Sequence, residues 1–150
     1  MGNILSIVNQ KGGVGKTTTA VNLAAAIGGH GKKVLLVDID PQGNASSGFG
    51  ITKKMTAVSS YDVLMGAFPA KDAIVKTNFR GVDILPSSMQ LAGAEIELVQ
   101  LNDRVLRLKK ALLAVKDSYD FVFIDCPPSL GLITLNALTA SDSLLVPIQC

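Results

Sequence analysis

The chain has 150 residues, of which 48% are hydrophobic and 5% aromatic, and its formal net charge is +2. This length corresponds to about one domain with a buried core, and so small a charge does not by itself indicate nucleic-acid binding. No run of 18 or more apolar residues and no basic-then-apolar leader occurs, so we expect neither a membrane span nor a signal peptide. Two distant cysteines, Cys126 and Cys150, predict a reduced cytoplasmic protein.

Hydrophobic patterning predicts strands that alternate with helices along the chain. The expected strands lie near 4–9, 33–38, 82–86, 120–125 and 143–148. The expected helices lie near 16–29, 59–66, 88–117 and 130–139. This alternation predicts a doubly wound, mostly parallel α/β sheet whose ligands bind at the carboxyl ends of the strands. The stretch 42–60, rich in Gly, Ser and Thr, is expected to be a mobile surface loop.

A glycine-rich loop with two lysines joins the first expected strand to the first expected helix. It reads Asn9-Gln10-Lys11-Gly12-Gly13-Val14-Gly15-Lys16-Thr17-Thr18. Its end matches the phosphate-binding pattern G-x-x-x-x-G-K-[ST], but Gln10 stands where the first glycine of that pattern belongs. Free amides and the positive dipole end at a helix N-terminus favour an anion. We therefore expect a nucleotide-phosphate site here; the alternative is a glycine-rich turn with a chance lysine.

Aspartates follow two of the expected strands. Asp38 ends one apolar run, and Asp40 comes where the chain turns. One such carboxylate can hold Mg²⁺ through water and the other can orient an attacking water, because phosphoryl transfer mostly needs positioning and charge neutralisation. The alternative for both is a role in the turn alone. Asp125 follows four apolar residues, as in a Walker B strand. Cys126 has no Cys or His at ligand spacing and is expected to be a buried structural thiol.

A heptad-like apolar stripe runs along the expected helix 88–117. Its members are Leu91, Ala94, Leu98, Leu101, Val105, Leu108, Leu112 and Val115. We expect one long helix that docks this stripe on the sheet, with a coiled-coil dimer seam as the alternative. The basic residues of the same helix are expected to form a solvated face, with a weak DNA-contacting patch as the alternative. These residues are Arg104, Arg107, Lys109 and Lys110.

Together these segments resemble the deviant Walker A ATPases of the ParA/MinD family, with the greatest likeness to ParA/Soj-type chromosome and plasmid partition proteins. The segments that carry the resemblance are 11–18, 37–44, 125–131, 132–138 and 146–149. The resemblance therefore covers nearly the whole chain. It implies a P-loop NTPase fold of ParA/MinD type, ATPase activity, and ATP and Mg²⁺ as cofactors.

The resemblance also assigns roles to single residues. The ATP-binding residues it implies are Lys11, Gly12, Gly13, Val14, Gly15, Lys16, Thr17 and Thr18. Lys16 contacts the β- and γ-phosphates of its own subunit, whereas Lys11 reaches the nucleotide of a second subunit in an ATP-bound sandwich dimer. Thr17 gives its hydroxyl to Mg²⁺, and Thr18 lies on the α-phosphate.

The implied roles of the aspartates complete this set. Asp40 sets up the attacking water, and Asp38 and Asp125 hold Mg²⁺ through its waters. Lys11, Lys16 and Asp40 are thus the expected catalytic residues, and Thr17, Asp38 and Asp125 the expected metal residues.

The implied function is that of a cytoplasmic, nucleoid-associated ATPase. It would segregate chromosomes or plasmids through an ATP-dependent homodimer, non-specific DNA binding and a ParB-like centromere-binding partner. Alternatives are a MinD-like membrane-surface ATPase in division-site placement, an iron–sulfur carrier and a small-molecule ligase of the same fold.

The length of the chain adds a further expectation. ParA-type proteins continue well beyond Cys150, so residues 1–150 are expected to be the N-terminal portion of a single P-loop ATPase domain that is truncated at its C-terminus. In such a truncated relative we expect weak ATP turnover, impaired DNA binding and an exposed sheet edge that favours association.

Overall fold

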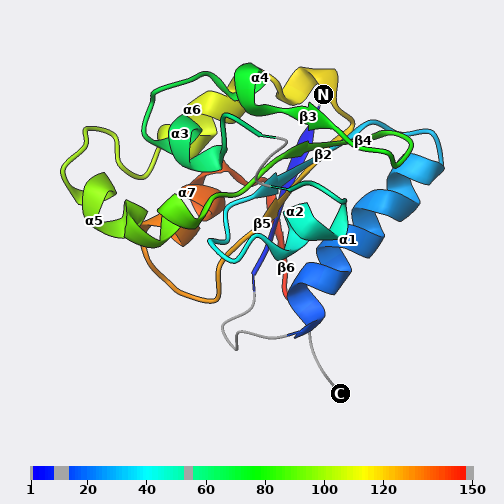
Figure 1. Ribbon diagram of the computed structural model, residues 1–150, viewed down its shortest axis with the longest axis horizontal. Helices are drawn as coiled ribbons and strands as arrows, with labels where there is room; N and C mark the ends of the chain where they lie inside the picture. Colours follow the sequence, from blue (N-terminus) through cyan, green and yellow to red (C-terminus); the bar gives the residue numbers. More distant parts are fainter. Residues whose placement is uncertain (1, 9–13, 53–55, 148–150) are drawn as a thin grey trace.

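The computed structural model describes residues 2–8, 14–52 and 56–147. Three predicted phosphate-loop residues, Lys11, Gly12 and Gly13, lie outside the described residues, as does Cys150. Within the described ranges, the backbone forms one sheet with helices on both faces (Figure 1). This arrangement confirms the predicted α/β class.

The sheet in the described ranges has six strands in the order β3-β4-β2-β5-β1-β6. Their bounds are β1 Asn3–Ile7, β2 Val34–Asp38, β3 Val75–Lys76, β4 Val82–Leu85, β5 Phe121–Asp125 and β6 Ser143–Leu145. All neighbours pair in parallel except β3, which runs antiparallel to β4. The five parallel strands therefore present their carboxyl ends at one edge of the sheet, as the alternating pattern predicted.

Helices cover the two faces unequally. The helices are α1 Val14–Gly29, α2 Asn44–Gly48, α3 Ser60–Leu64, α4 Ala70–Ala73, α5 Ala94–Val99, α6 Arg107–Leu113 and α7 Leu132–Ala140, with 3₁₀ turns at Met89–Gly93 and Lys116–Ser118. Figure 1 shows α1 and α2 on one side of the sheet and α3, α6 and α7 on the other. No helix in the described ranges has the length and apolarity that a bilayer crossing needs.

Each face of the sheet has its own apolar core because successive strand residues point to opposite sides. Leu35, Val37 and Ile124 pack with the residues of α3 to α7. Leu36 and Phe123 pack with the residues of α1 and α2 on the other face. The small alanines of α1, buried at positions 20 and 24, let that helix lie close to the strands. Packing on both faces thus holds the strands, and with them their carboxyl ends, in place.

The prediction of one long helix over 88–117 is wrong. The segment is broken into the 3₁₀ turn 89–93, α5 and α6, with a non-helical stretch between α5 and α6. In that stretch Asp103 has a positive φ of 56°, which no helix accommodates. Val99 is the last residue of α5, and its carbonyl accepts a hydrogen bond from the Arg104 guanidinium at 3.1 Å.

Most of the apolar stripe is nevertheless buried as expected, although Leu101 and Val105 are only partly buried. Four of its leucines have no exposed surface and belong to the same core cluster as residues of α7 and the strands. They are Leu91, Leu98, Leu108 and Leu112. The coiled-coil seam is therefore excluded, because these side chains are already packed within the chain. Arg107 also departs from the expected solvated face, since its guanidinium donates to the carbonyls of Leu64 and Asn102.

The described part of the stretch 42–60, residues 42–52 and 56–60, is not the continuous surface loop that its composition predicts. Its first part forms α2, and Ala45, Ser46, Phe49 and Ile51 are buried. The Phe49 ring meets Phe79 edge-to-face, with centroids 5.0 Å apart. Five residues of helix are too few to show a helical period, so patterning could not reveal α2.

Candidate nucleotide and magnesium site

Two aspartates meet at the carboxyl edge of the sheet. Asp38 ends β2 and Asp125 ends β5, and the two residues are register partners on adjacent strands. On its other side Asp125 is paired with Ile7, the last residue of β1. Both aspartates are fully buried. The structure therefore brings together the two carboxylates that the sequence predicted as metal residues, next to the point where β1 leads toward the phosphate loop.

Asp38 is held by backbone and hydroxyl donors. Its Oδ2 accepts from the Ser46 amide at 2.9 Å and from the Ser46 hydroxyl at 2.7 Å. Its Oδ1 accepts from the Asp40 amide at 3.1 Å. Oδ2 thus has both lone pairs engaged, while Oδ1 keeps one for a further donor. This geometry suits a carboxylate that reaches a metal through a water molecule rather than one that binds it directly.

The charge of Asp38 is disfavoured in this setting. Burial raises the pKa of Asp38 to about 7, the neighbouring Asp125 adds to the rise, and the Ser46 hydrogen bonds oppose it. Two buried carboxylates side by side repel each other when both are ionised. A divalent cation near this edge would offset that repulsion. Oxygen donors are also what Mg²⁺ prefers, and it commonly takes only one or two protein carboxylates together with water and phosphate. The residues present therefore fit the predicted magnesium ion.

Asp40 stands in the turn that follows β2. Its Oδ1 accepts from the Gln42 amide at 3.0 Å, and its carbonyl accepts from the Gly43 amide at 2.9 Å. Gly43 takes a φ of 65°, which glycine adopts without strain. Asp40 is 5% exposed and lies two residues from Asp38. The turn role that composition alone suggested is thus real, and it holds the carboxylate at the same edge as the acidic pair.

The described part of the phosphate loop enters α1. Val14, Gly15, Lys16, Thr17 and Thr18 lie in the first turns of that helix. The side chains of 14–17 are not among the described ones. The helix packs on β2 and β5. The described backbone thus shows the predicted strand before the loop segment and the predicted helix after it, and the roles of single loop residues stay predictions.

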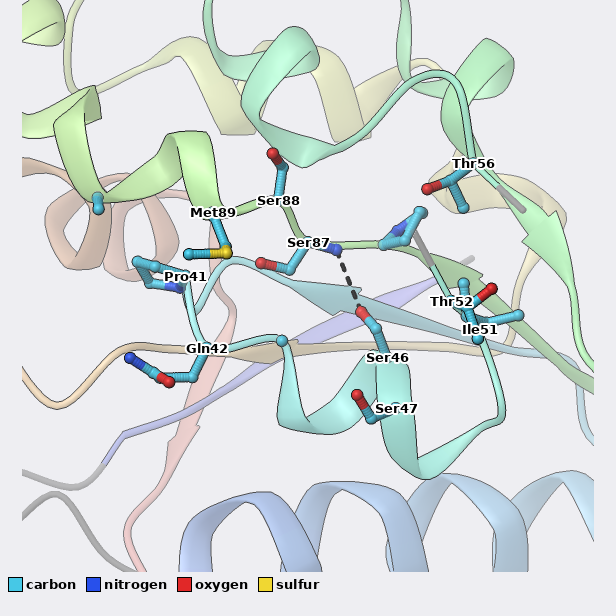
Figure 2. Close-up of a pocket in the computed structure, with 13 residues that line it drawn as sticks. Pro41, Gln42, Ser46, Ser47, Ile51, Thr52, Thr56, Ser87, Ser88 and Met89 are labelled. Atoms are coloured by element: carbon cyan, nitrogen blue, oxygen red, sulfur yellow. Dashed lines mark hydrogen bonds between the residues drawn. The ribbon is translucent and has the colours of Figure 1, made fainter. Parts of the chain in front are cut away.

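A small pocket opens beside the acidic edge, between α2 and the segment after β4 (Figure 2). Six of its thirteen lining residues carry hydroxyl groups, among them Ser46, Ser47, Thr52, Ser87 and Ser88. Ser46 accepts from the Ser87 amide at 3.1 Å, so the same hydroxyl that donates to Asp38 also ties down the β4 end. The cavity volume of about 220 Å³ is below that of ordinary ligand pockets.

Cys126 behaves as predicted. Its side chain is fully buried in the apolar core, and its thiol contacts the carbonyl of Ile124 at 3.8 Å. Across the described ranges, no group of three or more His, Cys, Asp or Glu side chains comes together as a metal site. The interpretation of Cys126 as a structural thiol agrees with its surroundings.

Sequence reasoning missed Ser46, Ser87 and Glu95 as site residues. Ser46 lies in the segment expected to be a loop, and its partner Ser87 is 41 residues away. Glu95 binds the start of α7, which follows the loop after Asp125. These contacts join parts of the chain that are distant in sequence, and no local pattern signals them.

An AAA domain family model (AAA_31) matches residues 2–150. The chain belongs to this AAA domain family. Within the family, the sporulation initiation inhibitor protein Soj of Bacillus subtilis is 59% identical over 150 residues, which are 100% of this chain and 59% of that protein. The chromosome partitioning protein ParA of Caulobacter vibrioides is 52% identical over 149 residues, which are 98% of this chain and 56% of that protein. The resemblance to ParA/Soj-type proteins is confirmed.

Solved structures agree with the AAA domain assignment. A Mycobacterium smegmatis cobyrinic acid a,c-diamide synthase, with bound ATP analogue and magnesium, superposes with a TM-score of 0.95 and 44% identity, covering 100% of this chain and 61% of that one. A Borrelia burgdorferi putative plasmid partition protein bound to AMPPNP gives a TM-score of 0.88 and 29% identity, covering 98% and 61%. The chain spans less than two thirds of the length of these four proteins.

Proposed function

We propose that this chain is the nucleotide-binding portion of a ParA/Soj-type partition ATPase, which segregates chromosomes or plasmids through ATP-dependent dimerisation and non-specific DNA binding. The observation that carries the proposal is the buried Asp38–Asp125 pair at the carboxyl edge of the sheet, beside the strand that leads into the phosphate loop. The 59% identity to a Soj protein supports the partition role. Residues 1–150 form the N-terminal portion of a single P-loop ATPase domain in this proposal.

Each residue of the site has one task in hydrolysis. Lys16 neutralises charge on the β- and γ-phosphates, and the Thr17 hydroxyl holds Mg²⁺. Asp38 and Asp125 would hold that ion through its waters. When bound, Mg²⁺ supplies charge neutralisation across the phosphate oxygens. Asp40 orients the attacking water, and its place in a tight turn keeps its carboxylate at the same edge as the pair.

Lys11 couples nucleotide binding to dimerisation in this account. A lysine donated to the partner's phosphates lowers their charge only when two subunits meet, so ATP and the second subunit stabilise each other. Thr18 contacts the α-phosphate, and the glycines between the lysines leave room for the phosphates. Loss of Lys11 therefore acts on the dimer, whereas loss of Lys16 acts on nucleotide binding itself.

The partners follow from the same proposal. ATP-bound dimers associate with the nucleoid in the cytoplasm through non-specific DNA contacts, and a ParB-like centromere-binding protein triggers hydrolysis. ATP turnover by residues 1–150 alone is weak, because these residues match less than two thirds of the related ATPases.

Alanine variants of the two lysines test this division of labour in the full-length protein. We expect Lys16→Ala to weaken ATP binding in equilibrium titrations. Lys11→Ala should bind ATP like the wild type but remain monomeric with Mg²⁺-ATP in sedimentation. Lys32→Ala is the matched control, since this exposed lysine precedes β2 at the opposite edge of the sheet. Equal behaviour of the Lys11 and Lys16 variants would refute the proposal.

A second candidate function is ATP-dependent amide synthesis on a small carboxylic acid. It is favoured by the TM-score of 0.95 to a protein described as a cobyrinic acid a,c-diamide synthase. Steady-state ATP turnover separates the two functions. Stimulation by DNA with a ParB-like partner supports partition, whereas stimulation by a carboxylic acid and an amide donor, with formation of an amide product, supports synthesis.

A further inference from the structure

A carboxylate from α5 caps the first turn of α7. Glu95 accepts hydrogen bonds from the amides of Leu132 at 2.5 Å and Ile133 at 3.1 Å, one on each carboxylate oxygen. Amides in the first turn of a helix lack partners within that helix, and the positive dipole end there favours an anion. The cap comes from a residue 37 positions earlier in the chain. It therefore fixes where α7 begins relative to α5.

Gly131 is the residue that makes this contact possible. A Cβ added at Gly131 would overlap with the Glu95 carboxylate, lying 2.5 Å from its Cδ. The backbone of Gly131 has a φ of −86° and a ψ of −167°, an extended conformation that any residue can adopt. An alanine at 131 would therefore have to displace the Glu95 carboxylate, although its backbone conformation would be unstrained. The two residues form a matched pair, which we term the Glu95–Gly131 contact.

The capped end of α7 is linked to Asp125 by a short and stiff segment. Only residues 126–130 lie between Asp125 and Gly131, and two of them, Pro127 and Pro128, have fixed φ angles. The Thr134 hydroxyl donates to the Ser129 carbonyl at 2.5 Å, which ties the same segment to α7. A displacement of the start of α7 is therefore passed on toward Asp125 instead of being absorbed by a flexible loop.

We propose that Glu95 is a positioning residue for the nucleotide site, which holds the segment after Asp125 in place through the Glu95–Gly131 contact. The proposal rests on the proposed ATPase function. In this proposal Glu95 acts through the amides of α7 and not by contact with nucleotide or metal. Its effect is expected on the turnover step, which depends on exact placement of reacting groups, more than on ATP binding.

The first experiment tests the contact itself without nucleotide. Amide hydrogen exchange is measured in the full-length protein for wild type, Glu95→Ala and Gly131→Ala. We expect faster exchange at Leu132 and Ile133 in both variants. Glu97→Ala, which removes the same charge from the same helix, should leave these two amides as in the wild type, since Glu97 bonds the Tyr61 hydroxyl instead. Unchanged protection in Glu95→Ala would overturn the proposal at this step.

The second experiment measures Mg²⁺-ATP hydrolysis by the same variants and by the double variant. We expect Glu95→Ala and Gly131→Ala each to lower kcat about tenfold with KM for ATP within about twofold of wild type. The double variant should equal Glu95→Ala, because a methyl at position 131 has nothing to displace once Glu95 is gone. Glu95→Gln keeps acceptor oxygen and should recover part of the loss.

Two results would overturn the positioning role. A wild-type kcat in Glu95→Ala despite lost amide protection would make Glu95 a structural cap only. Fully additive effects in the double variant would show that Gly131 matters for a reason other than Glu95. A wild-type protein that hydrolyses no ATP would instead reject the proposed function, while the exchange experiment would still decide whether the contact exists.

Discussion

Asp38 is the residue whose environment most directly opposes its ordinary charge. It is fully buried, it stands beside Asp125, and its pKa rises to about 7, mainly through burial. The Ser46 amide and hydroxyl hold its carboxylate in one orientation despite this cost. A buried carboxylate with a raised pKa is typical of a functional site, such as one that binds a cation. The stability of the metal-free protein should therefore depend on pH through the titration of Asp38.

Replacement of Asp38 by Asn tests that pH dependence of stability. An acid whose folded pKa is raised stabilises the fold fully below its unfolded pKa of 3.8, and this contribution is lost as pH rises through about 7. The asparagine variant lacks this titration, although a hydrogen-bond mismatch with its donors adds a constant cost. The measurement is urea unfolding without Mg²⁺. The free energy of unfolding of the variant, relative to that of wild type, should rise by about 3 kcal/mol between about pH 4 and pH 8. Parallel pH curves for the two proteins would contradict the assignment.

Helix α1 shows how an element is positioned for function by its smallest residues. Its buried alanines face the sheet, and Gly28 faces the turn before β4. A Cβ at Gly28 would overlap with the Arg80 carbonyl and lie 2.8 Å from a methyl of Val82. A Cβ at Gly29 would meet nothing within 4 Å. The close approach of α1 to the sheet thus depends on one of two adjacent glycines.

Alanine at these two positions should have opposite effects on stability. Gly28→Ala forces the helix away from a backbone carbonyl that cannot rotate aside, and should lower the free energy of unfolding by about 1–3 kcal/mol. Gly29→Ala improves helix propensity without a clash and should change it by between zero and about 1 kcal/mol in the stabilising direction. Chemical denaturation of both variants measures the difference. A loss of similar size in both would show that helix fraying, not packing, governs this end of α1.

The elements that sequence could predict are those with a strong local signal, either a period or a continuous apolar run. The strands β2 and β5 are uninterrupted apolar runs, and their buried character was readable directly. The two-residue β3 and the four-residue α4 are too short for any periodic signal. The segment 88–117 failed differently: its stripe is truly buried, but a turn with a positive φ at Asp103 interrupts the helix that the stripe suggested.

At the scale of the whole molecule, the site is a property of the topology. Parallel pairing of β2, β5 and β1 places Asp38, Asp125 and the end of β1 at one edge. That convergence was predictable, because aspartates at the carboxyl ends of alternating strands must meet there. The supporting contacts of Ser46, Ser87 and Glu95 were not, since they depend on how distant segments pack after the sheet has formed.

In the described sheet, β3 is the edge strand on one side and β6 is the edge strand on the other. Leu144 and Val146 are about half exposed there, and Ser143 is also exposed. An exposed apolar edge strand favours association with further chain. Dimerisation measurements on residues 1–150 must therefore separate contact at β6, which is indifferent to nucleotide, from contact at the carboxyl ends of the strands, which the proposal makes dependent on ATP.

Sedimentation velocity of the full-length protein with different nucleotides shows whether ATP drives dimerisation. We expect a monomer with Mg²⁺-ADP and a dimer with a non-hydrolysable ATP analogue and Mg²⁺, because only a γ-phosphate offers the partner's Lys11 its additional charge. Removal of Mg²⁺ should return the analogue-bound protein to the monomer. The same association state with ADP, with the analogue and without nucleotide would contradict the account.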